Sequence, residues 1–269
     1  MAVSYTHLDV YKRQILGAGK LGSIVARAWK AGKMPEYELV GILSRTADSA
    51  HALAAEVGVA WTTQLEELLR WKPQIVAEAA SVEAVKANAI AVLQGGADFV
   101  TLAIGAFADA DFYEEVQAVA RAAGRKVYIA SGAIGGFDLM RTAAVMSPIE
   151  ASITSETGPQ YLRTTPVYRE EMAASETTLT AFEGTAKEAI ALLPRRVNVA
   201  VATSLATNGP EHTGVKIEST PGFIGDTHTI RVEGEEIKAE IAIYSRTSAI
   251  AGYSVVALLN NIASPIQFQ

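Results

Sequence analysis

Three glycines near the beginning of the chain have the spacing of a loop that holds phosphate groups. Gly17, Gly19 and Gly22 in the stretch GAGKLG fit the pattern G-x-G-x-x-G. The first glycine of this pattern allows a tight turn, the second lets a pyrophosphate approach the backbone, and the third lets a helix pack closely on a strand. A helix-like and then a strand-like segment follow here, so the sequence predicts a dinucleotide site at which the helix N-terminus faces the phosphates. Lys20 and Leu21 complete the loop and are predicted to contact the cofactor.

The end of the second predicted strand, at Leu43, indicates which dinucleotide binds. An acidic residue at this place binds the ribose 2′-hydroxyl of NAD, but here Ser44, Arg45 and Thr46 follow the strand and no carboxylate is present. A guanidinium can pair with a 2′-phosphate through two hydrogen bonds. We therefore expect NADP, or the use of NADP and NAD with NADP favoured, with Ser44 and Arg45 as contacts. A solvated Arg45 that stacks on adenine is the alternative.

The first half of the chain has the pattern of a framework that would position these residues. From Ile15 to about residue 130, short apolar runs alternate with stretches of helical periodicity, which indicates βαβ units and a parallel sheet. After about residue 150, strand-like segments follow one another, and only 185–193 is clearly helical between them, which indicates an antiparallel or mixed sheet. The segment 198–206 is one of these predicted strands, and 248–262 is predicted to be a helix.

The predicted fold is α/β: a Rossmann doubly wound parallel sheet plus a smaller α+β domain with a mixed or antiparallel sheet. We expect a dinucleotide-binding domain at 1–130 and a substrate and dimerisation domain at 131–244. A C-terminal helix at 245–269 is expected to return to the first domain.

Composition limits the classes of function. The net charge of −6 argues against a nucleic-acid binder that works by neutralising phosphates. The chain has no cysteine, so it has no disulfide and no thiolate nucleophile, and it lacks the His/Asp spacing of a metal site. No apolar run reaches the roughly 18 residues of a membrane span. We therefore expect a cytoplasmic protein that needs neither a metal nor a membrane.

Several stretches resemble the L-aspartate dehydrogenase family, from about Ile15 to the end of the chain. The two most specific are SGAIGGFD and FEGTAKEAIALLPRRVNVAVATSLA, whereas the glycine loop is shared by many dehydrogenases. The matching stretches are 17–22, 77–81, 105–109, 131–138 and 182–206, with 226–234 and 246–254 similar in outline.

The resemblance implies an NAD(P)-dependent enzyme that oxidatively deaminates L-aspartate to iminoaspartate, and so to oxaloacetate and ammonia, or runs the reverse reductive amination. It also implies a homodimer and a role in NAD biosynthesis. The chain departs from the family pattern where substrate should bind: Thr154, Ser155 and Glu156 replace a Thr-Arg-Lys stretch, and Asp226 replaces an asparagine. Two alternatives therefore stay open, an imine reductase or amino-acid or amine dehydrogenase with another substrate, and a non-catalytic NAD(P)-binding sensor.

Oxidising an amino acid to an imine requires a hydride to leave Cα, a base to take a proton from the ammonium, and donors that hold the substrate carboxylates. By the resemblance, His228 is the acid/base, a role that suits an imidazole. On a strand it would share a face with Asp226 and Ile230, and Asp226 could raise its pKa. His212 is the second candidate, and His51 is expected to be solvated. Asn198, in a predicted apolar strand, either binds substrate or braces a loop.

Two loops at strand ends complete the predicted site. The glycines of SGAIGG (131–136) let backbone N–H groups hold a carboxylate or flank the nicotinamide, with a tight strand-to-helix turn as the alternative. Glu78 is expected to be either structural or catalytic, and Arg196 or Lys216 could supply charge for a side-chain carboxylate. The predicted cofactor contacts are Gly17, Gly19, Lys20, Leu21, Gly22, Ser44, Arg45, Ala80, Ser81 and Ala133, and the predicted substrate contacts are Gly132, Ile134, Gly135 and Asn198.

The residues before the glycine loop do not fit a buried strand. The stretch VSYTHLDVYKRQ (3–14) carries Asp, Lys, Arg and Gln where an apolar run is expected. Back-translated, its two arms form an inverted repeat that resembles the transposase mosaic-end adaptor used in sequencing libraries. We expect 3–14 to be a cloning or assembly artefact, so that Lys12, Arg13 and Gln14 stand in for core residues and His7 has no functional role. A natural polar leader is the alternative.

Overall fold

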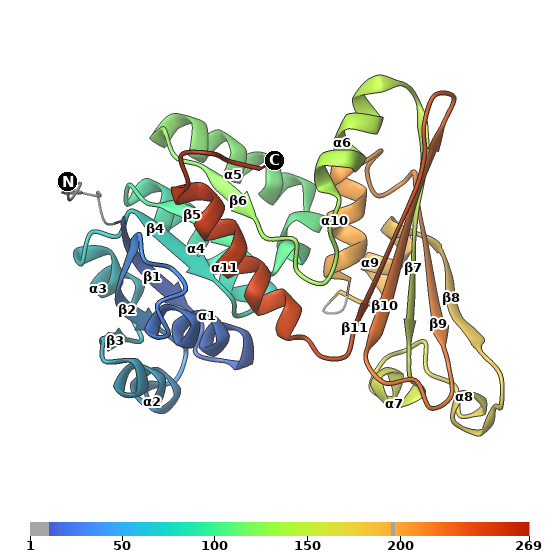
Figure 1. Cartoon of the computed structure of the whole chain (residues 1–269), viewed down its shortest axis with the longest axis horizontal. Helices are drawn as coiled ribbons and strands as arrows, with labels where there is room; N and C mark the ends of the chain where they lie inside the picture. Colours follow the sequence, from blue (N-terminus) through green and yellow to red (C-terminus); the bar gives the residue numbers. More distant parts are fainter. Residues whose placement is uncertain (1–10, 195–196, 269) are drawn as a thin grey trace, which may run out of the picture. The chain divides into compact units, whose positions relative to one another are not determined.

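The computed structural model describes residues 11–194 and 197–268, which form two compact units (Figure 1). Unit 1 comprises the chain up to Ala130 together with Ala251–Phe268, and unit 2 comprises Ser131–Ile250. Unit 2 is therefore inserted into the sequence of unit 1. Within the described ranges, no helix has the length and apolar character needed to cross a membrane.

A six-stranded parallel sheet forms the centre of unit 1, in the order β3-β2-β1-β4-β5-β6. The strand order reverses between β1 and β4, as it does in the Rossmann fold, and ligands of such sheets bind outside the carboxyl ends of the strands at this reversal. The predicted doubly wound sheet is confirmed. The strands are β1 (Tyr11–Leu16), β2 (Tyr37–Leu43), β3 (Ala60–Thr62), β4 (Ile75–Glu78), β5 (Asp98–Thr101) and β6 (Val127–Ile129).

Helices connect these strands, and polar side chains define where several of them begin. Ser81 accepts a hydrogen bond from the backbone N–H of Ala84, and Asp109 accepts one from Phe112. Gly58, in the left-handed conformation, ends α2. The helices are α1 (Lys20–Lys30), α2 (Ala47–Val57), α3 (Leu65–Arg70), α4 (Val82–Gln94), η1 (Ile104–Ala108), α5 (Ala110–Ala123) and α11 (Ala249–Ala263).

The core of unit 1 includes residues from both of its chain segments. All residues of β4 are buried, as expected for a strand covered on both faces. From α11, Val255, Val256 and Leu259 join the same apolar cluster as Ile15 of β1. The hydroxyl of Tyr37 donates to the carbonyl oxygen of Leu259 at 2.6 Å. The last helix is therefore part of the core of unit 1.

Unit 2 is built on a five-stranded mixed sheet in the order β11-β10-β7-β9-β8. Strands β7 and β9 are parallel, and the other neighbours are antiparallel, so the predicted mixed sheet is confirmed. Figure 1 shows α6 and α10 on one side of this sheet, where α6 contacts β10 and α10 contacts β7. The strands are β7 (Ile149–Thr157), β8 (Leu179–Thr185), β9 (Thr213–Ser219), β10 (Asp226–Gly234) and β11 (Lys238–Ser245). The helices are α6 (Phe137–Met146), α7 (Pro159–Leu162), α8 (Glu171–Ala174), α9 (Ala186–Leu192) and α10 (Asn198–Ala206).

The prediction of a strand at 198–206 is wrong, because this segment is the helix α10. Five consecutive residues from Ala200 to Ser204 are buried, so the helix has no polar stripe that would reveal a helical period. Its hydroxyl groups are satisfied within the helix: Thr203 donates to the carbonyl of Val199, and Ser204 donates to that of Val201, both at 2.9 Å. Asn198 is consequently the first residue of a helix and does not lie inside a strand.

The segment predicted to be an artefact lies partly within the described residues. Residues 3–10, including His7, lie outside them, whereas 11–14 belong to β1. The backbone of β1 pairs with β2 on one side and β4 on the other, so it occupies the centre of the sheet. Arg13 is in register with Leu39 and Ile75, which are both buried. Positions 12–14 thus stand where apolar side chains are expected, and the origin of the segment stays a prediction.

Candidate active site

The glycine loop joins β1 to α1 and leaves little room for side chains. Gly17 has a φ of +118°, and its N–H donates to the carbonyl of Leu43 at 2.8 Å. A Cβ atom at Gly17 would lie 2.9 Å from the carbonyl oxygen of Ala79, and one at Gly22 would collide with the carbonyl oxygen of Gly17. Gly19 is exposed, with open space where a Cβ would be. Gly17 and Gly22 therefore fix the shape of the loop, and Gly19 leaves its backbone open to a ligand.

Helix α1 begins at Lys20, directly after this loop. Its N-cap is Gly19, so no side chain caps the first turn, and this turn contains no acidic residue. The first N–H groups of a helix lack partners inside the helix and carry a partial positive charge. The loop and the first turn of α1 together fit the pyrophosphate of a dinucleotide.

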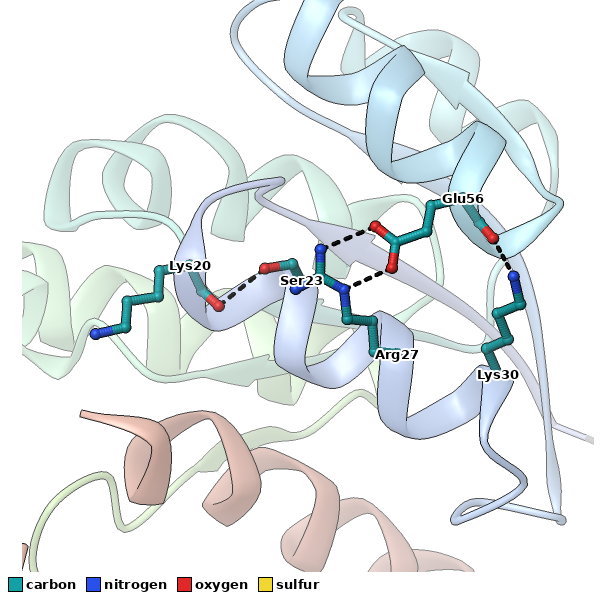
Figure 2. Close-up of polar contacts among 5 residues, drawn as sticks. All are labelled: Lys20, Ser23, Arg27, Lys30 and Glu56. Carbon is teal, nitrogen blue, oxygen red and sulfur yellow. Dashed lines mark hydrogen bonds and ion pairs between the residues drawn. The ribbon is translucent and has the colours of Figure 1, made fainter. Parts of the chain in front are cut away.

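The cations near the loop differ in whether they already have partners. The guanidinium of Arg27 binds the carboxylate of Glu56 with two hydrogen bonds of 2.6 and 2.9 Å, and the ammonium of Lys30 donates to the backbone carbonyl of Glu56 (Figure 2). In Figure 2 the ammonium of Lys20 points away from this group. Among the described residues, the ammonium of Lys20 and the exposed guanidinium of Arg45 make no hydrogen bond or ion pair. The ammonium of Lys20 and the guanidinium of Arg45 are therefore free to meet a phosphate.

The segment after β2 is rich in hydroxyl groups. The hydroxyl of Ser49 lies 2.9 Å from the hydroxyl of Ser44 and 2.5 Å from the hydroxyl of Thr46. Ser44 is half-buried, and Arg45 beside it is exposed. The three residues directly after β2, Ser44, Arg45 and Thr46, include no carboxylate, which is the group that binds the ribose 2′-hydroxyl in NAD-specific proteins.

Glu78, at the end of β4, is a buried carboxylate that binds two neighbouring loops. Its Oε1 accepts from the backbone N–H of Ala80 at 2.6 Å. Its Oε2 accepts from the hydroxyl of Thr101 at 2.9 Å and from the N–H groups of Leu102 at 3.1 Å and Ala103 at 3.0 Å. Burial raises the pKa of Glu78, and these donors oppose the rise. Because every contact is a donor to the carboxylate, the arrangement supports the structural alternative for Glu78.

In unit 2, a cavity of about 260 Å³ brings two of the predicted site residues together. His228 from β10 and Asn198 from α10 both line it, and so does Asp226. The remaining polar lining comes from β7 and from the segment around α7. Its polar side chains are Ser155, Thr157, Tyr161, Thr165, Asn198, Asp226 and His228. The volume suits a small metabolite.

His228 is held on the covered face of the sheet and is 8% exposed. Its Nδ1 lies 2.9 Å from the hydroxyl oxygen of Ser155. Burial lowers the pKa of His228, whereas the negative charge of Asp226 raises it. The expected effect of Asp226 has the right sign, but burial outweighs it. The lowered pKa favours the neutral imidazole, which is the form that can accept a proton. The predicted shared face with Ile230 is confirmed, since both residues are buried and their neighbours Thr229 and Arg231 are less so.

The N-terminus of α10 forms another wall of the cavity, which the sequence did not predict. Val197 to Ala200 line the cavity, and the N-cap residue Val197 provides no side-chain hydrogen bond. The backbone N–H groups of this first turn, together with the amide of Asn198, suit a carboxylate. An asparagine directly before an apolar run is a signal for a helix start, and it would have indicated this feature.

Comparisons with known proteins identify the family. The family model described as aspartate dehydrogenase, C-terminal, matches residues 138–262, and the model described as homoserine dehydrogenase, NAD binding domain, matches residues 17–130. An L-aspartate dehydrogenase of Methanosarcina acetivorans is 31% identical, and the alignment covers 94% of this chain and 97% of the relative. The chain belongs to the L-aspartate dehydrogenase family.

A second relative supports this assignment, and a solved structure shows the same fold. An L-aspartate dehydrogenase of Methanococcus maripaludis strain C5 is 30% identical, over 94% of this chain and 97% of the relative. The crystal structure of aspartate dehydrogenase from Thermotoga maritima superposes with a TM-score of 0.78 at 24% identity, covering 96% of this chain and 99% of that one. This chain and the Thermotoga maritima protein therefore have the same fold.

The SGAIGG stretch that resembles the family forms a turn between β6 and α6. Gly132 and Gly136 have positive φ angles, and Ile134 is buried. A Cβ at Gly135 would lie 3.9 Å from Ile243 of β11, so the turn packs against the sheet of unit 2. The predicted contacts Gly132, Ala133, Ile134 and Gly135 do not line the His228 cavity. Their roles toward ligand stay predictions.

Other candidates from the sequence lie elsewhere. His212 lines a different cavity of unit 2, with Asn208 and Glu150. His51 is exposed, with its ring 5.6 Å from that of Trp61. Lys216 pairs with Glu218 at 2.7 Å. Arg196 lies outside the described residues.

Proposed function

We propose that this chain is an NAD(P)-dependent L-aspartate dehydrogenase that oxidises L-aspartate to iminoaspartate, which water converts to oxaloacetate and ammonia. The observation that carries the proposal is a buried His228 that shares a cavity with Asn198 and the N-terminus of α10. The family supports the choice of substrate, because its curated members are named L-aspartate dehydrogenases.

In this proposal the residues of the cavity divide the work of binding and proton transfer. The first turn of α10 and the amide of Asn198 bind a substrate carboxylate. His228 takes the proton from the ammonium group, so that the nitrogen lone pair can form the C=N bond as the hydride leaves Cα. Water then adds to the iminium carbon and the nitrogen leaves with protons from that water, while the proton on His228 passes to solvent and the base is neutral again. Burial favours this cycle, because it keeps His228 unprotonated before the substrate binds.

The glycine loop of unit 1 is proposed to hold the dinucleotide, which when bound would supply the acceptor for the hydride. Gly19, the free first turn of α1 and the ammonium of Lys20 would hold the pyrophosphate, with Leu21 beside them. Ala80 and Ser81, at the end of β4, would line the ribose or the nicotinamide. The fit rests on the loop itself, where side chains at Gly17 or Gly22 would collide with backbone atoms.

We propose that NADP is preferred over NAD because Arg45 is free to bind a 2′-phosphate. A hydrogen bond to a charged group contributes about 1.5–3 kcal/mol, so Arg45→Ala should raise the KM for NADP about 10- to 100-fold and leave the KM for NAD nearly unchanged. Arg27→Ala is the matched control, since Arg27 is engaged by Glu56. An unchanged ratio of the two KM values in Arg45→Ala would reject the preference.

The reaction is tested by following NADPH formation with L-aspartate against a panel of amino acids and amines. His228→Ala should lower kcat with L-aspartate about 10²- to 10⁴-fold, the usual contribution of a general base. His212→Ala is the control, because His212 lines the other cavity, and it should keep nearly normal kcat. Near-normal turnover by His228→Ala would overturn the assignment of the base. Tight NADPH binding without turnover of any substrate would favour the sensor.

The charge of the cavity favours a second candidate within the same reaction class. Asp226 lines it, and no Lys or Arg does so within 11–194 and 197–268. An acidic side chain suits an ammonium group better than a second carboxylate. The second candidate is therefore an amino acid with one carboxylate, and a higher kcat/KM for such a substrate than for L-aspartate would select it. That the enzyme is a homodimer stays a prediction, which its mass in solution measures.

A further inference from the structure

We propose that Ser155 is the positioning residue of His228: it accepts a hydrogen bond from Nδ1–H and so reserves Nε2 for the substrate proton. The proposal rests on the proposed function and adds to it the side chain that selects the reactive tautomer. Ser155 lies in the stretch where the chain departs from its family's basic residues, so it was not predicted as a site residue.

The backbone places the two side chains together. Ser155 on β7 is directly opposite His228 on the antiparallel neighbour β10. Residues that are directly opposite in an antiparallel pair extend from the same face of the sheet. The distance from Oγ to Nδ1 is 2.9 Å, and both residues line the same cavity. The contact is therefore built into the register of two central strands and does not depend on a mobile loop.

The chemistry of the pair selects one tautomer for the working base. A neutral imidazole has one N–H and one lone pair, and the partner of one nitrogen determines the role of the other. When Nδ1–H donates to Oγ of Ser155, Nε2 carries the lone pair and can accept the ammonium proton. The same hydrogen bond persists after protonation, because Nδ1–H is present in the imidazolium as well. Ser155 thus supports both halves of the proton cycle without rotating the ring.

A hydroxyl partner differs from the carboxylate that often orients a histidine, because it adds no charge. The other ionisable side chains that line the described part of the cavity are Asp226, from β10 itself, and Tyr161, from α7. Of these, Asp226 raises the pKa of His228, and burial lowers it. Ser155 therefore fixes the direction of the ring, while Asp226 and burial determine how readily it is protonated.

The test compares Ser155→Ala with Ser155→Thr, which restores the hydroxyl, and with Thr154→Ala, which removes a hydroxyl from the opposite face of the same strand. Nitrogen NMR of labelled histidine reads the tautomer and the pKa of His228 in the protein without substrate, and His228→Gln identifies its signals. In Ser155→Ala we expect the Nδ1–H tautomer to lose its dominance and the pKa of His228 to fall, because the imidazolium loses an acceptor. Ser155→Thr and Thr154→Ala should resemble the wild type.

Turnover provides the second measurement. Ser155→Ala should lower kcat about tenfold to a hundredfold, the cost of a misplaced catalytic group, with a smaller change in KM. An unchanged tautomer and pKa in Ser155→Ala would overturn the proposal, and so would a pKa that rises, since Ser155 would then be the donor to Nδ1. If the NMR changes occur but no variant or wild type oxidises L-aspartate, the role of Ser155 stands and the proposed function fails.

Discussion

Glu78 offers a direct measurement of how a buried carboxylate organises the carboxyl edge of the sheet in unit 1. We compare two neutral replacements, Glu78→Gln and Glu78→Leu, so that the cost of burying a charge is absent from both. The oxygen of glutamine can take the place of Oε2 and keep the donors from Thr101, Leu102 and Ala103. Leucine has a similar size and accepts nothing, so these donors are left buried without a partner.

Each buried donor that loses its partner costs about 1–3 kcal/mol, so Glu78→Leu should be less stable than Glu78→Gln by at least about 3 kcal/mol. All the tryptophans of the chain, Trp29, Trp61 and Trp71, lie in unit 1, so their fluorescence reports its unfolding in urea. With a slope of about 1–3 kcal/mol per molar urea, the midpoint should differ by about 1 M or more. Glu114→Leu, at an exposed glutamate of α5, is the control and should change stability by less than about 0.5 kcal/mol. Equal midpoints for the two Glu78 variants would refute the reasoning.

Three further predictions concern the glycine loop, the base and the first strand. Gly22→Ala should weaken NADPH binding about 10- to 100-fold and lower the Tm, because the new Cβ would collide with the carbonyl of Gly17. Gly19→Ala should also weaken NADPH binding but leave the Tm unchanged, because a Cβ at Gly19 meets no protein atom. Calorimetry measures both the binding and the Tm. As the pH is lowered, kcat/KM should fall with an apparent pKa below 6.5, because burial lowers the pKa of His228. Asp226→Asn should move this fall in kcat/KM to still lower pH, because it removes the charge that raises the pKa of His228. An apparent pKa above 6.5 would contradict the assignment of His228 as the base. Replacing Lys12, Arg13 and Gln14 by Val, Ala and Val should raise the Tm, by about 2–4 °C for each kcal/mol by which the free energy of unfolding increases. An unchanged or lower Tm would count against an artefact in β1.

Most of the framework was predictable because its patterns are local. The alternation of apolar strands and helices carries its own signal, and terminal glycines such as Gly58 after α2 mark where helices end. The helices α6, α7 and α8 and the short elements β3, α3 and η1 were not predicted. Such elements are fixed by packing more than by periodicity, and several of them have fewer than eight residues.

The candidate site was predictable only in part, because its members come together through strand register. His228 and Asp226 share a face by simple alternation, and that part of the prediction is confirmed. Ser155 could not be found, since its partnership with His228 depends on how β7 and β10 align, 73 residues apart. The place of Asn198 was mistaken because five consecutive residues of α10, Ala200 to Ser204, are buried, which hides the helical period. The sequence left the role of Glu78 undecided between structural and catalytic, because most of its hydrogen-bond partners lie at the end of the neighbouring strand β5.

The insertion of unit 2 into unit 1 has a consequence for how the protein is made. A ribosome releases the glycine loop and the parallel strands first, yet the core around Ile15 is complete only when Val255, Val256 and Leu259 have emerged. Unit 2 lies on one continuous segment and can finish folding while unit 1 still exposes apolar surface. The half of the chain that is synthesised first is therefore the last to become native. In a nascent or truncated chain that stops before α11, unit 1 should therefore fail to fold, although most of its residues lie far from the truncation in sequence.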